Sequence, residues 1–367
     1  MSGKQKKIVI VILAFALISS VALSMYLIGG REKKGDNDSQ PQQTAQETET
    51  PSPTATPDTH VGMVRSQITG KWVKEEVAKK RCYAVMINNI EYAFKHQMGT
   101  SKADVIYEAL AEGGITRMLA LYEDISNVKK IGSVRSARHY YVQFAEEWDA
   151  IYCHFGHTKY AVKKMKKLKT DNLSGLSAIG GVVYSRDKSI AAPHNVFTNG
   201  KKMKKGAKKL GYSLKRNESA MAEHFTFHEK DTELPGGEKA ENITIPFSAY
   251  STCKMKYDTK KKVYKKYEYG KKHMDTYYKK QLTFKNVIIQ LVDESNIDRN
   301  GYQTMSLSNN KGKGYYYTDG KRINITWSRN ESANTMEYYD EDGNLLTVNP
   351  GKTYIAVYPK SRKKLIK

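Results

Sequence analysis

The longest apolar run of the chain lies near its N-terminus. Residues 8–28 contain no charged side chain; a lysine-containing tail, residues 1–7, precedes them, and Arg31 follows. At a rise of about 1.5 Å per residue, about 20 apolar residues cross the hydrocarbon core of a bilayer. The pattern therefore predicts one transmembrane anchor at residues 8–28 and a basic cytoplasmic tail at residues 1–7.

A cleaved secretion signal is the competing interpretation of this run. Such signals usually have a shorter apolar region, about 7–15 residues, that ends in small residues. Here the run ends in the bulky segment 25–28, and no cysteine lies near it to accept a lipid. We therefore expect a single-pass protein of the cell membrane that keeps its anchor.

A polar segment separates the anchor from the rest of the chain. Residues 36–59 are rich in Ser, Thr, Pro, Gln and Glu and show no apolar period. This composition is typical of disordered linkers, and we assign residues 29–70 to one. Such a tether places the folded domains outside the cytoplasm, near the outer face of the membrane.

Strand and helix patterns alternate between residues 71 and 235. Apolar runs predict strands, and apolar positions that recur every three to four residues predict helices. We expect the third helix below to begin at a cap formed by Ser133 or Ser136. The alternation predicts an α/β N-terminal domain, with strands at 83–88, 118–122, 131–134 and 151–155 and helices at 103–112, about 136–148 and 159–169.

The helical period fades in residues 236–367. Short strand patterns alternate with turn signals, of which Asp319-Gly320 and Asp342-Gly343 are typical of tight hairpins. This half is predicted to be an antiparallel β-rich C-terminal domain. The section 254–280 is so rich in lysine that we expect its strands to be exposed.

The net positive charge of the chain favours anionic partners. The net charge is +23, and only 12 of the 61 basic residues are arginine. A lysine-rich surface attracts anions diffusely, so an anionic wall polymer, a lipid-linked precursor, an envelope protein or the membrane surface are the expected partners. Nucleic acid is disfavoured because no known binding motif is present. The cysteines, Cys82, Cys153 and Cys253, lack CxxC spacing, and we expect three small buried side chains.

The few arginines are therefore informative. Arg117, Arg135, Arg138 and Arg186 fall within the predicted α/β domain. A guanidinium group binds carboxylate or phosphate through two parallel hydrogen bonds, which lysine cannot do. Arg135 and Arg138 also lie near a predicted helix start, which favours anions. We expect an arginine-lined cleft for an anion, and internal ion pairs are the alternative.

Carboxylates and histidines supply the candidate acid–base groups. Asp104, Glu108 and Glu112 recur every four residues and would share one helix face, facing either solvent, cations or a substrate. His154 and His157 follow a predicted strand, and with His194 they could bind a metal, although nothing fixes their spacing and we assign no metal or cofactor. The catalytic candidates are Asp104, Glu108, His154 and His194; the candidate ligand-binding residues are Asn88, Asn89, Glu112, Arg117, Arg135, Arg138, Arg186, Asp187 and Asn195.

Several of these segments resemble the YerB-like family of bacterial envelope lipoproteins, whose function is unknown. The resemblance extends over about residues 70–360 and implies an extracytoplasmic protein of two domains without a known activity. The chain departs from that family in having a predicted transmembrane anchor where the family has a lipid-accepting cysteine. The matching motifs are RCYAVMINN from Arg81, ADVIYE from Ala103, EGGITRM from Glu112, IGSVRSAR from Ile131, APHN from Ala192, GKGYY from Gly312, ITW from Ile325 and NPGKTY from Asn349.

Two functions follow from these patterns. The first is a non-enzymatic envelope protein that binds an anionic cell-wall or envelope ligand through the arginine-lined cleft. The second is an enzyme that acts on a phosphate-containing or glycan cell-wall substrate, with the arginines holding the anion. The two differ in whether the candidate acid–base groups face the arginines.

Overall fold

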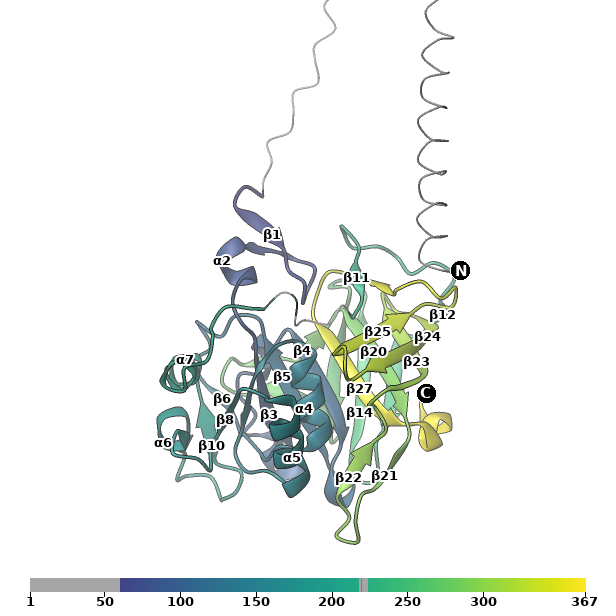
Figure 1. Cartoon of the computed structure of the whole chain (residues 1–367). Coiled ribbons are helices and arrows are strands. Elements are labelled where there is room, and N and C mark those ends of the chain that lie inside the picture. Colours follow the sequence, from purple (N-terminus) through teal and green to yellow (C-terminus); the bar gives the residue numbers. More distant parts are fainter. Residues whose placement is uncertain (1–59, 218, 220–223) are drawn as a thin grey trace, which may run out of the picture. The chain divides into compact units, whose positions relative to one another are not determined.

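One large mixed sheet runs through the part of the chain that the structure, a computed structural model, describes: residues 60–217, 219 and 224–367 (Figure 1). Its eleven strands follow the order β12-β24-β23-β20-β27-β4-β5-β3-β7-β8, and β25 pairs with β24. The bounds are β3 (Tyr83–Asn89), β4 (Val105–Leu110), β5 (Thr116–Tyr122), β7 (Ile151–His154), β8 (Asn172–Ser174), β12 (Glu238–Lys239), β20 (Asn286–Val292), β23 (Asn310–Thr318), β24 (Lys321–Asn330), β25 (Thr335–Tyr339) and β27 (Thr353–Pro359).

The predicted tail and anchor, and the linker up to residue 59, lie outside the described residues. Within those residues, no helix is long and apolar enough to cross a membrane. The end of the predicted linker, however, is ordered. Residues 63–65 form β1, which pairs with β2 (Trp72–Lys74), and Ile68 between them is fully buried. The assignment of residues 60–70 to a disordered linker was therefore wrong.

The N-terminal part is an α/β arrangement with a mixed sheet. β4, β5 and β3 pair antiparallel, and β7 and β8 extend the sheet in parallel. Every residue of β3, β4 and β5 is buried, which explains their continuous apolar character. The remaining elements are α2 (Glu75–Ala78), α3 (Glu91–Phe94), η1 (Thr100–Lys102), η2 (Glu112–Gly114), β6 (Ile131–Gly132), α4 (His139–Glu146), α5 (Lys159–Leu168), α6 (Gly180–Val183), β9 (Ser185–Arg186), β10 (Val196–Thr198) and α7 (Gly200–Lys209).

The helix predicted at 103–112 is wrong, because this segment contains the central strand β4 between β27 and β5. A short run that is apolar on both sides fits a buried strand and a buried helix equally well, so its period does not decide. The segment is a strand because it pairs with β27 along one edge and with β5 along the other. As a consequence, Asp104, Glu108 and Glu112 do not share a helix face.

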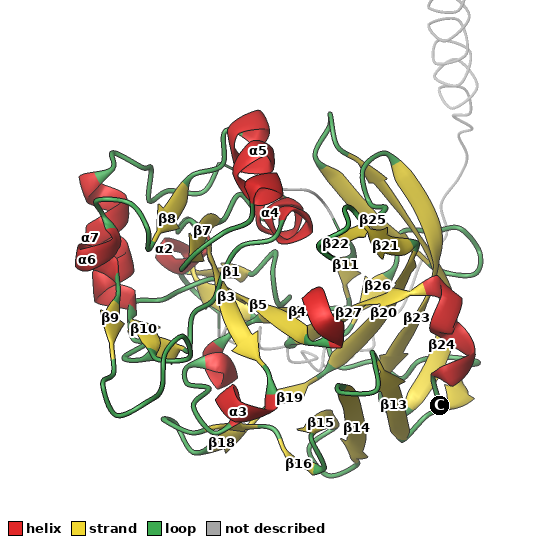
Figure 2. Cartoon of the chain, turned by 90° about the horizontal axis from the view of Figure 1, so that it is seen from below, coloured by secondary structure: helices red, strands yellow, loops and turns green. Residues whose placement is uncertain are grey.

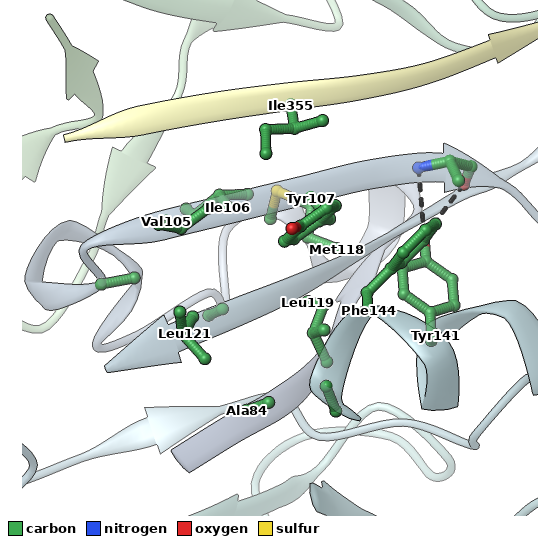
Figure 3. Packing of buried hydrophobic residues seen from close by; sticks show 14 of the residues in the cluster. Ala84, Val105, Ile106, Tyr107, Met118, Leu119, Leu121, Tyr141, Phe144 and Ile355 are labelled. Atoms are coloured by element: carbon green, nitrogen blue, oxygen red, sulfur yellow. Dashed lines mark hydrogen bonds between the residues drawn. The ribbon is translucent and has the colours of Figure 1, made fainter. Parts of the chain in front are cut away.

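The helix α4 covers one face of these strands. Tyr141 on α4 hydrogen-bonds through its hydroxyl to the backbone of Ala109 on β4, and Phe144 stacks on Tyr107 at 4.7 Å between ring centroids (Figure 3). α4 begins at His139, after Arg138, and no side chain caps it. The predicted cap at Ser133 or Ser136 is therefore wrong, whereas the helix α5 begins at a Thr158 side-chain cap.

The C-terminal part is rich in antiparallel strands. β23 and β24 form the predicted hairpin, and both turn residues, Asp319 and Gly320, have positive φ angles, as a type I′ turn requires. A second sheet combines β13, β14, β15, β16 and β19. The bounds of the other elements are β11 (Thr226–Phe227), β13 (Asn242–Pro246), β14 (Thr252–Asp258), β15 (Val263–Glu268), β16 (Lys271–Lys272), β17 (Met274–Asp275), β18 (Lys280–Gln281), β19 (Thr283–Phe284), β21 (Glu294–Asn296), β22 (Gln303–Met305), β26 (Thr347–Val348) and η4 (Lys360–Leu365).

The two parts share the large sheet. β27, from the end of the chain, pairs in parallel with β20 on one side and with β4 on the other. The sheet is therefore continuous across the predicted domain boundary at residues 235 and 236, and the described residues belong to one compact unit. Cys82, Cys153 and Cys253 are buried and free, as expected.

Candidate functional site

Two polar clusters lie on opposite faces of the sheet at the end of β3. Asn88 is paired with Arg117 across β3 and β5, and Asn89 is paired with Thr116. Because successive side chains of a strand point to opposite faces, the two asparagines enter different clusters. Figure 2 shows α3, β15 and β16 near the same end of β3.

The first cluster, which we call the arginine cluster, contains Arg117, Arg135, Arg138 and Glu112. Arg138 donates both Nε and Nη2 to the carboxylate of Glu112, which makes a bidentate ion pair. β5 supplies Arg117, while Arg135 and Arg138 lie on the extended segment that leads into α4. Arg117 and Arg138 both donate to the carbonyl of Ser136, so these side chains lie together, while the anion-binding role expected for them stays a prediction.

Among the described residues, Arg117 and Arg135 form no ion pair with a carboxylate. Arg117 donates Nη1 to the carbonyl of Ser136, and Arg135 donates Nη1 to the carbonyl of Pro193 at 3.2 Å. Nε of Arg135 is buried and makes no hydrogen bond within the described part of the chain. Burial and the charge of Arg138 lower the pKa of Arg117 to about 10, which reports crowding of positive charge.

His194 borders this cluster. Its Nδ1 lies 2.8 Å from Nδ2 of Asn88, and its ring packs against Tyr92 at 5.0 Å between centroids. Burial and the charge of Arg135 lower the pKa of His194. The imidazole is therefore neutral at pH 7, and its Nδ1 accepts the hydrogen bond of the Asn88 amide.

The second cluster, which we call the buried ionic network, contains Glu108, Lys266, Glu268 and His273. All four side chains are fully buried. Nζ of Lys266 lies 3.0 Å from Oε2 of Glu108, 2.5 Å from Oε2 of Glu268 and 3.1 Å from Nδ1 of His273. A single ammonium group thus links β4 of the N-terminal part to β15 of the C-terminal part.

Neutral side chains complete the network. Tyr354 donates its hydroxyl to Oε2 of Glu108 at 2.7 Å, and Ser251 donates to Oε1 of Glu268 at 2.8 Å. Nδ2 of Asn89 lies 2.9 Å from Glu108 and 3.1 Å from Glu268, so it bridges the two carboxylates. Buried charges persist only when they are paired and hydrogen-bonded in this way.

The protonation states follow from the same contacts. Lys266 donates to Nδ1 of His273, so Nε2 carries the ring proton and donates to Oε1 of Gln97. Burial and the charge of Lys266 lower the pKa of His273 to about 4. Burial and the charge of Glu268 raise the pKa of Glu108, while Lys266 and His273 outweigh burial and lower that of Glu268. Two carboxylates that share one ammonium diverge in this way.

The remaining candidate residues do not join either cluster. Asp104 precedes β4 and accepts a hydrogen bond from the amide of Glu123. His154 is buried, its pKa is lowered to about 4 by burial, and with His157 it lines a separate cavity of about 460 Å³. The three arginines are not among the residues that line this cavity. The prediction of one helix-borne acid–base face is therefore wrong.

Arg186 on β9, and Asp187 and Asn195 in the loop that also contains His194, make their hydrogen bonds outside the arginine cluster. Arg186 donates Nη1 to Oδ1 of Asn195 at 2.7 Å and stacks on Phe155 at 4.8 Å from the ring centroid. Asp187 accepts hydrogen bonds from the amide and hydroxyl of Ser189. These contacts shape the loop. Across the described residues, no group of three or more His, Cys, Asp or Glu side chains could hold a metal ion.

The sequence analysis missed Lys266, Glu268 and His273 because it treated the section 254–280 as exposed. The signal was the alternation within β15: its buried positions are Tyr264, Lys266 and Glu268. A lysine and a glutamate two residues apart, on the same face as a tyrosine, indicate a buried pair. Glu108 was singled out, but its partners lie at least 158 residues further along the chain.

Comparisons with known proteins place the chain in a family. Residues 68–213 match the N-terminal domain, and residues 243–355 the C-terminal domain, of the family described as "Protein of unknown function (DUF3048)". "Putative lipoprotein YerB" of Bacillus subtilis (strain 168) is 31% identical over 308 residues, which cover 83% of this chain and 89% of that protein. The crystal structure of the Bacillus subtilis YerB protein has a TM-score of 0.73 at 28% identity and covers 83% of this chain and 99% of that chain. The resemblance noted in the sequence is confirmed, and the chain belongs to the DUF3048 family of YerB-like proteins.

Proposed function

We propose that this chain is a membrane-attached envelope protein that binds an anionic ligand at the arginine cluster. The ligand would be a phosphate- or carboxylate-bearing wall polymer or lipid-linked precursor. One observation carries the proposal: the guanidinium groups of Arg117, Arg135 and Arg138 lie close enough to repel one another, and Glu112 forms an ion pair with Arg138. A relative named as a lipoprotein supports the envelope location, and the predicted segment 8–28 would supply the membrane attachment here.

The electrostatics favour an added anion. Arg117 and Arg135 repel Arg138 and one another, and burial removes part of their hydration. Glu112 forms an ion pair with Arg138 and also offsets part of the charge of Arg117, so positive charge remains in excess. An oxyanion beside Arg135 would offset this repulsion and accept from its unpartnered Nε. The half-buried position of Arg135 leaves it reachable from solvent.

Binding is a better fit than catalysis. Of the predicted acid–base groups, Asp104, Glu108 and His154 form their contacts away from the arginines. His194 does border the cluster, but its Nδ1 accepts from Asn88. A general base needs a free lone pair within hydrogen-bond reach of the substrate, and no candidate with that position and a matched acid is among these residues.

The test measures co-sedimentation of the full chain, purified in mild detergent, with purified anionic wall polymer and, separately, with vesicles carrying a lipid-linked pyrophosphate precursor. The variant Arg135→Met keeps the packing of the side-chain stem and removes the charge. The control Arg322→Met removes a half-buried arginine that pairs with Glu238. We expect Arg135→Met to weaken binding at least tenfold and the control to change it less than twofold.

Equal binding by the wild type and Arg135→Met to both materials would overturn the proposal. The two materials separate the sources of the anion, because only one of them contains the lipid-linked pyrophosphate. Binding should also weaken steeply as salt is raised, since the contact is electrostatic.

A further inference from the structure

A small pocket lies where the N-terminal and C-terminal parts meet. Its volume is about 210 Å³. Thr100, Ser101 and Ala103, at and after η1, line one side, and residues 280–284 with Lys352 line the other. None of the residues of the arginine cluster or of the buried ionic network lines this pocket.

One residue that lines the pocket, Thr100, has a buried hydroxyl without a partner. The side chain of Thr100 is 1% exposed, and its Oγ1 makes no hydrogen bond to any residue that the structure describes. A buried polar atom without a partner costs about 1–3 kcal/mol, so nearly all such atoms are paired in folded proteins. A ligand oxygen in the pocket would supply the missing partner.

The charge of the pocket is positive. Lys352 donates Nζ to the carbonyl of Ser101, and neither Lys352 nor Lys280 forms an ion pair within the described ranges. Asp104 is the carboxylate whose charge favours the Lys352 ammonium, whereas Lys71, Lys102 and Lys280 oppose it. Burial and these three lysines lower the pKa of Lys352.

We propose that this pocket binds a small oxyanion, a phosphate group held by Lys352, Lys280 and the hydroxyl of Thr100. Ammonium and hydroxyl groups are common donors to phosphate oxygens, and the volume suits an anion of phosphate size. The phosphate is either free inorganic phosphate or the terminal monoester of a larger molecule. Both present the same oxygens to the pocket.

A bound phosphate would join the two parts of the molecule. Thr100 belongs to the N-terminal part, while Lys280 on β18 and Lys352 before β27 belong to the C-terminal part. An anion that contacts both sides stabilises their junction by the free energy of its binding. The site is independent of the proposed function, because it shares no residue with the arginine cluster.

The test is isothermal titration calorimetry of the full chain in detergent with inorganic phosphate and, separately, with glycerol phosphate. Thr100→Val is nearly isosteric and removes only the hydroxyl; Lys352→Met removes the buried charge. We expect each variant to bind at least tenfold more weakly than the wild type, and the melting temperature of the wild type to rise with the ligand that binds. The control Lys254→Met removes an exposed lysine of β14 and should bind as the wild type does.

The outcomes separate this site from the arginine cluster. Arg135→Met should keep phosphate binding at this pocket, so loss of binding in that variant but not in Thr100→Val would overturn the proposal. Absence of binding by both ligands in the wild type would overturn it as well. Since Thr100→Val keeps the volume and apolar contacts of the side chain, it remains informative even if Lys352→Met folds poorly.

Discussion

The arginine cluster and the buried ionic network lie at the same end of β3, on opposite faces of the sheet, and use charge in opposite ways. In the buried ionic network, one ammonium faces two carboxylates, and Tyr354, Ser251 and Asn89 complete the hydrogen bonds. In the arginine cluster, three guanidinium groups face one carboxylate. The buried ionic network is closed to solvent, and its charged groups all have partners. The arginine cluster is partly exposed to solvent and carries excess positive charge.

This difference suggests a different role for each cluster: the buried ionic network stabilises the fold, and the arginine cluster is the one that we propose binds a ligand. A buried charge that keeps all its partners stabilises one arrangement of the chain, and removing any member leaves the others exposed to the low dielectric of the interior. Excess like charge, in contrast, destabilises the fold slightly and persists where an anion can offset it. Substitutions should therefore damage stability on one face and binding on the other.

Lys266→Met should have the largest effect. It leaves Glu108 and Glu268 as two buried carboxylates without their cation, and breaking a buried pair in this way costs about 3–5 kcal/mol. Urea unfolding of the full chain measures the loss. The exposed Lys254 on the neighbouring strand β14 provides the control, and Lys254→Met should change stability by less than about 0.5 kcal/mol. Similar costs for the two variants would show that the network is not structural.

The histidine of the network should make stability depend on pH. Its pKa is lowered from 6.5 to about 4 in the folded state, so the unfolded chain binds more protons between those values. The contribution of His273 to the free energy of unfolding is therefore full above about pH 6.5. It decreases as the pH falls toward 4, by up to about 1.4 kcal/mol per pH unit. The free energy of unfolding of His273→Gln should fall less over this range than that of the wild type.

Unfolding curves at pH 7 and pH 4.5 test this prediction. The exposed His157 is the matched control, and His157→Gln should keep the pH dependence of the wild type. A parallel response of His273→Gln and the wild type would mean that the pKa of His273 is not lowered in the folded protein.

Tyr354→Phe should have an intermediate effect. It removes one hydroxyl that donates to Glu108 and leaves the packing of the ring intact. A hydrogen bond to a charged group contributes about 1.5–3 kcal/mol, and the other three donors to Glu108 remain, so we expect a loss near the lower end. Thermal unfolding measures it, with Tyr277→Phe, a tyrosine that is 43% exposed, as the control.

Arg135→Met should change stability least. The lost hydrogen bond to Pro193 is offset by relief of repulsion from Arg138, so the free energy of unfolding should stay within about 1 kcal/mol of the wild type. Binding to anionic wall material should nevertheless fall at least tenfold. If instead stability fell by as much as in Lys266→Met, the arginine cluster would be a structural element like the network opposite.

Local patterns predicted much of the fold. The strands β3, β5, β7 and β23, the helix α5 and the Asp319-Gly320 turn follow from apolar period and turn chemistry. Of the four arginines that stood out among the lysines, Arg117, Arg135 and Arg138 lie together and Arg186 does not. β4 was mistaken for a helix, since a strand buried on both faces has no distinctive period.

Local patterns could indicate that Lys266 and Glu268 are buried together, but not which residues of the N-terminal part they contact. Glu108 and Lys266 meet only because β27 brings the two parts of the chain together, and no spacing along the sequence encodes that pairing. The hydrophobic period of a sequence does not predict long-range ion pairs, because it describes only which residues share a face of one helix or strand. The alternation in β15 could only have indicated that Lys266 needs a partner.

The position of β27 also constrains how the protein is made. This strand lies inside the sheet between β4 and β20, although it follows β4 only after most of the folded sequence. The central pairing of β4 therefore has to wait until residues 353–359 have been synthesised and, if the chain is exported, translocated. Contacts of such high sequence separation slow folding and leave β4 with an open edge in the meantime. A chain that stops short of residue 353 should consequently be a target for envelope proteases and chaperones rather than a smaller working protein.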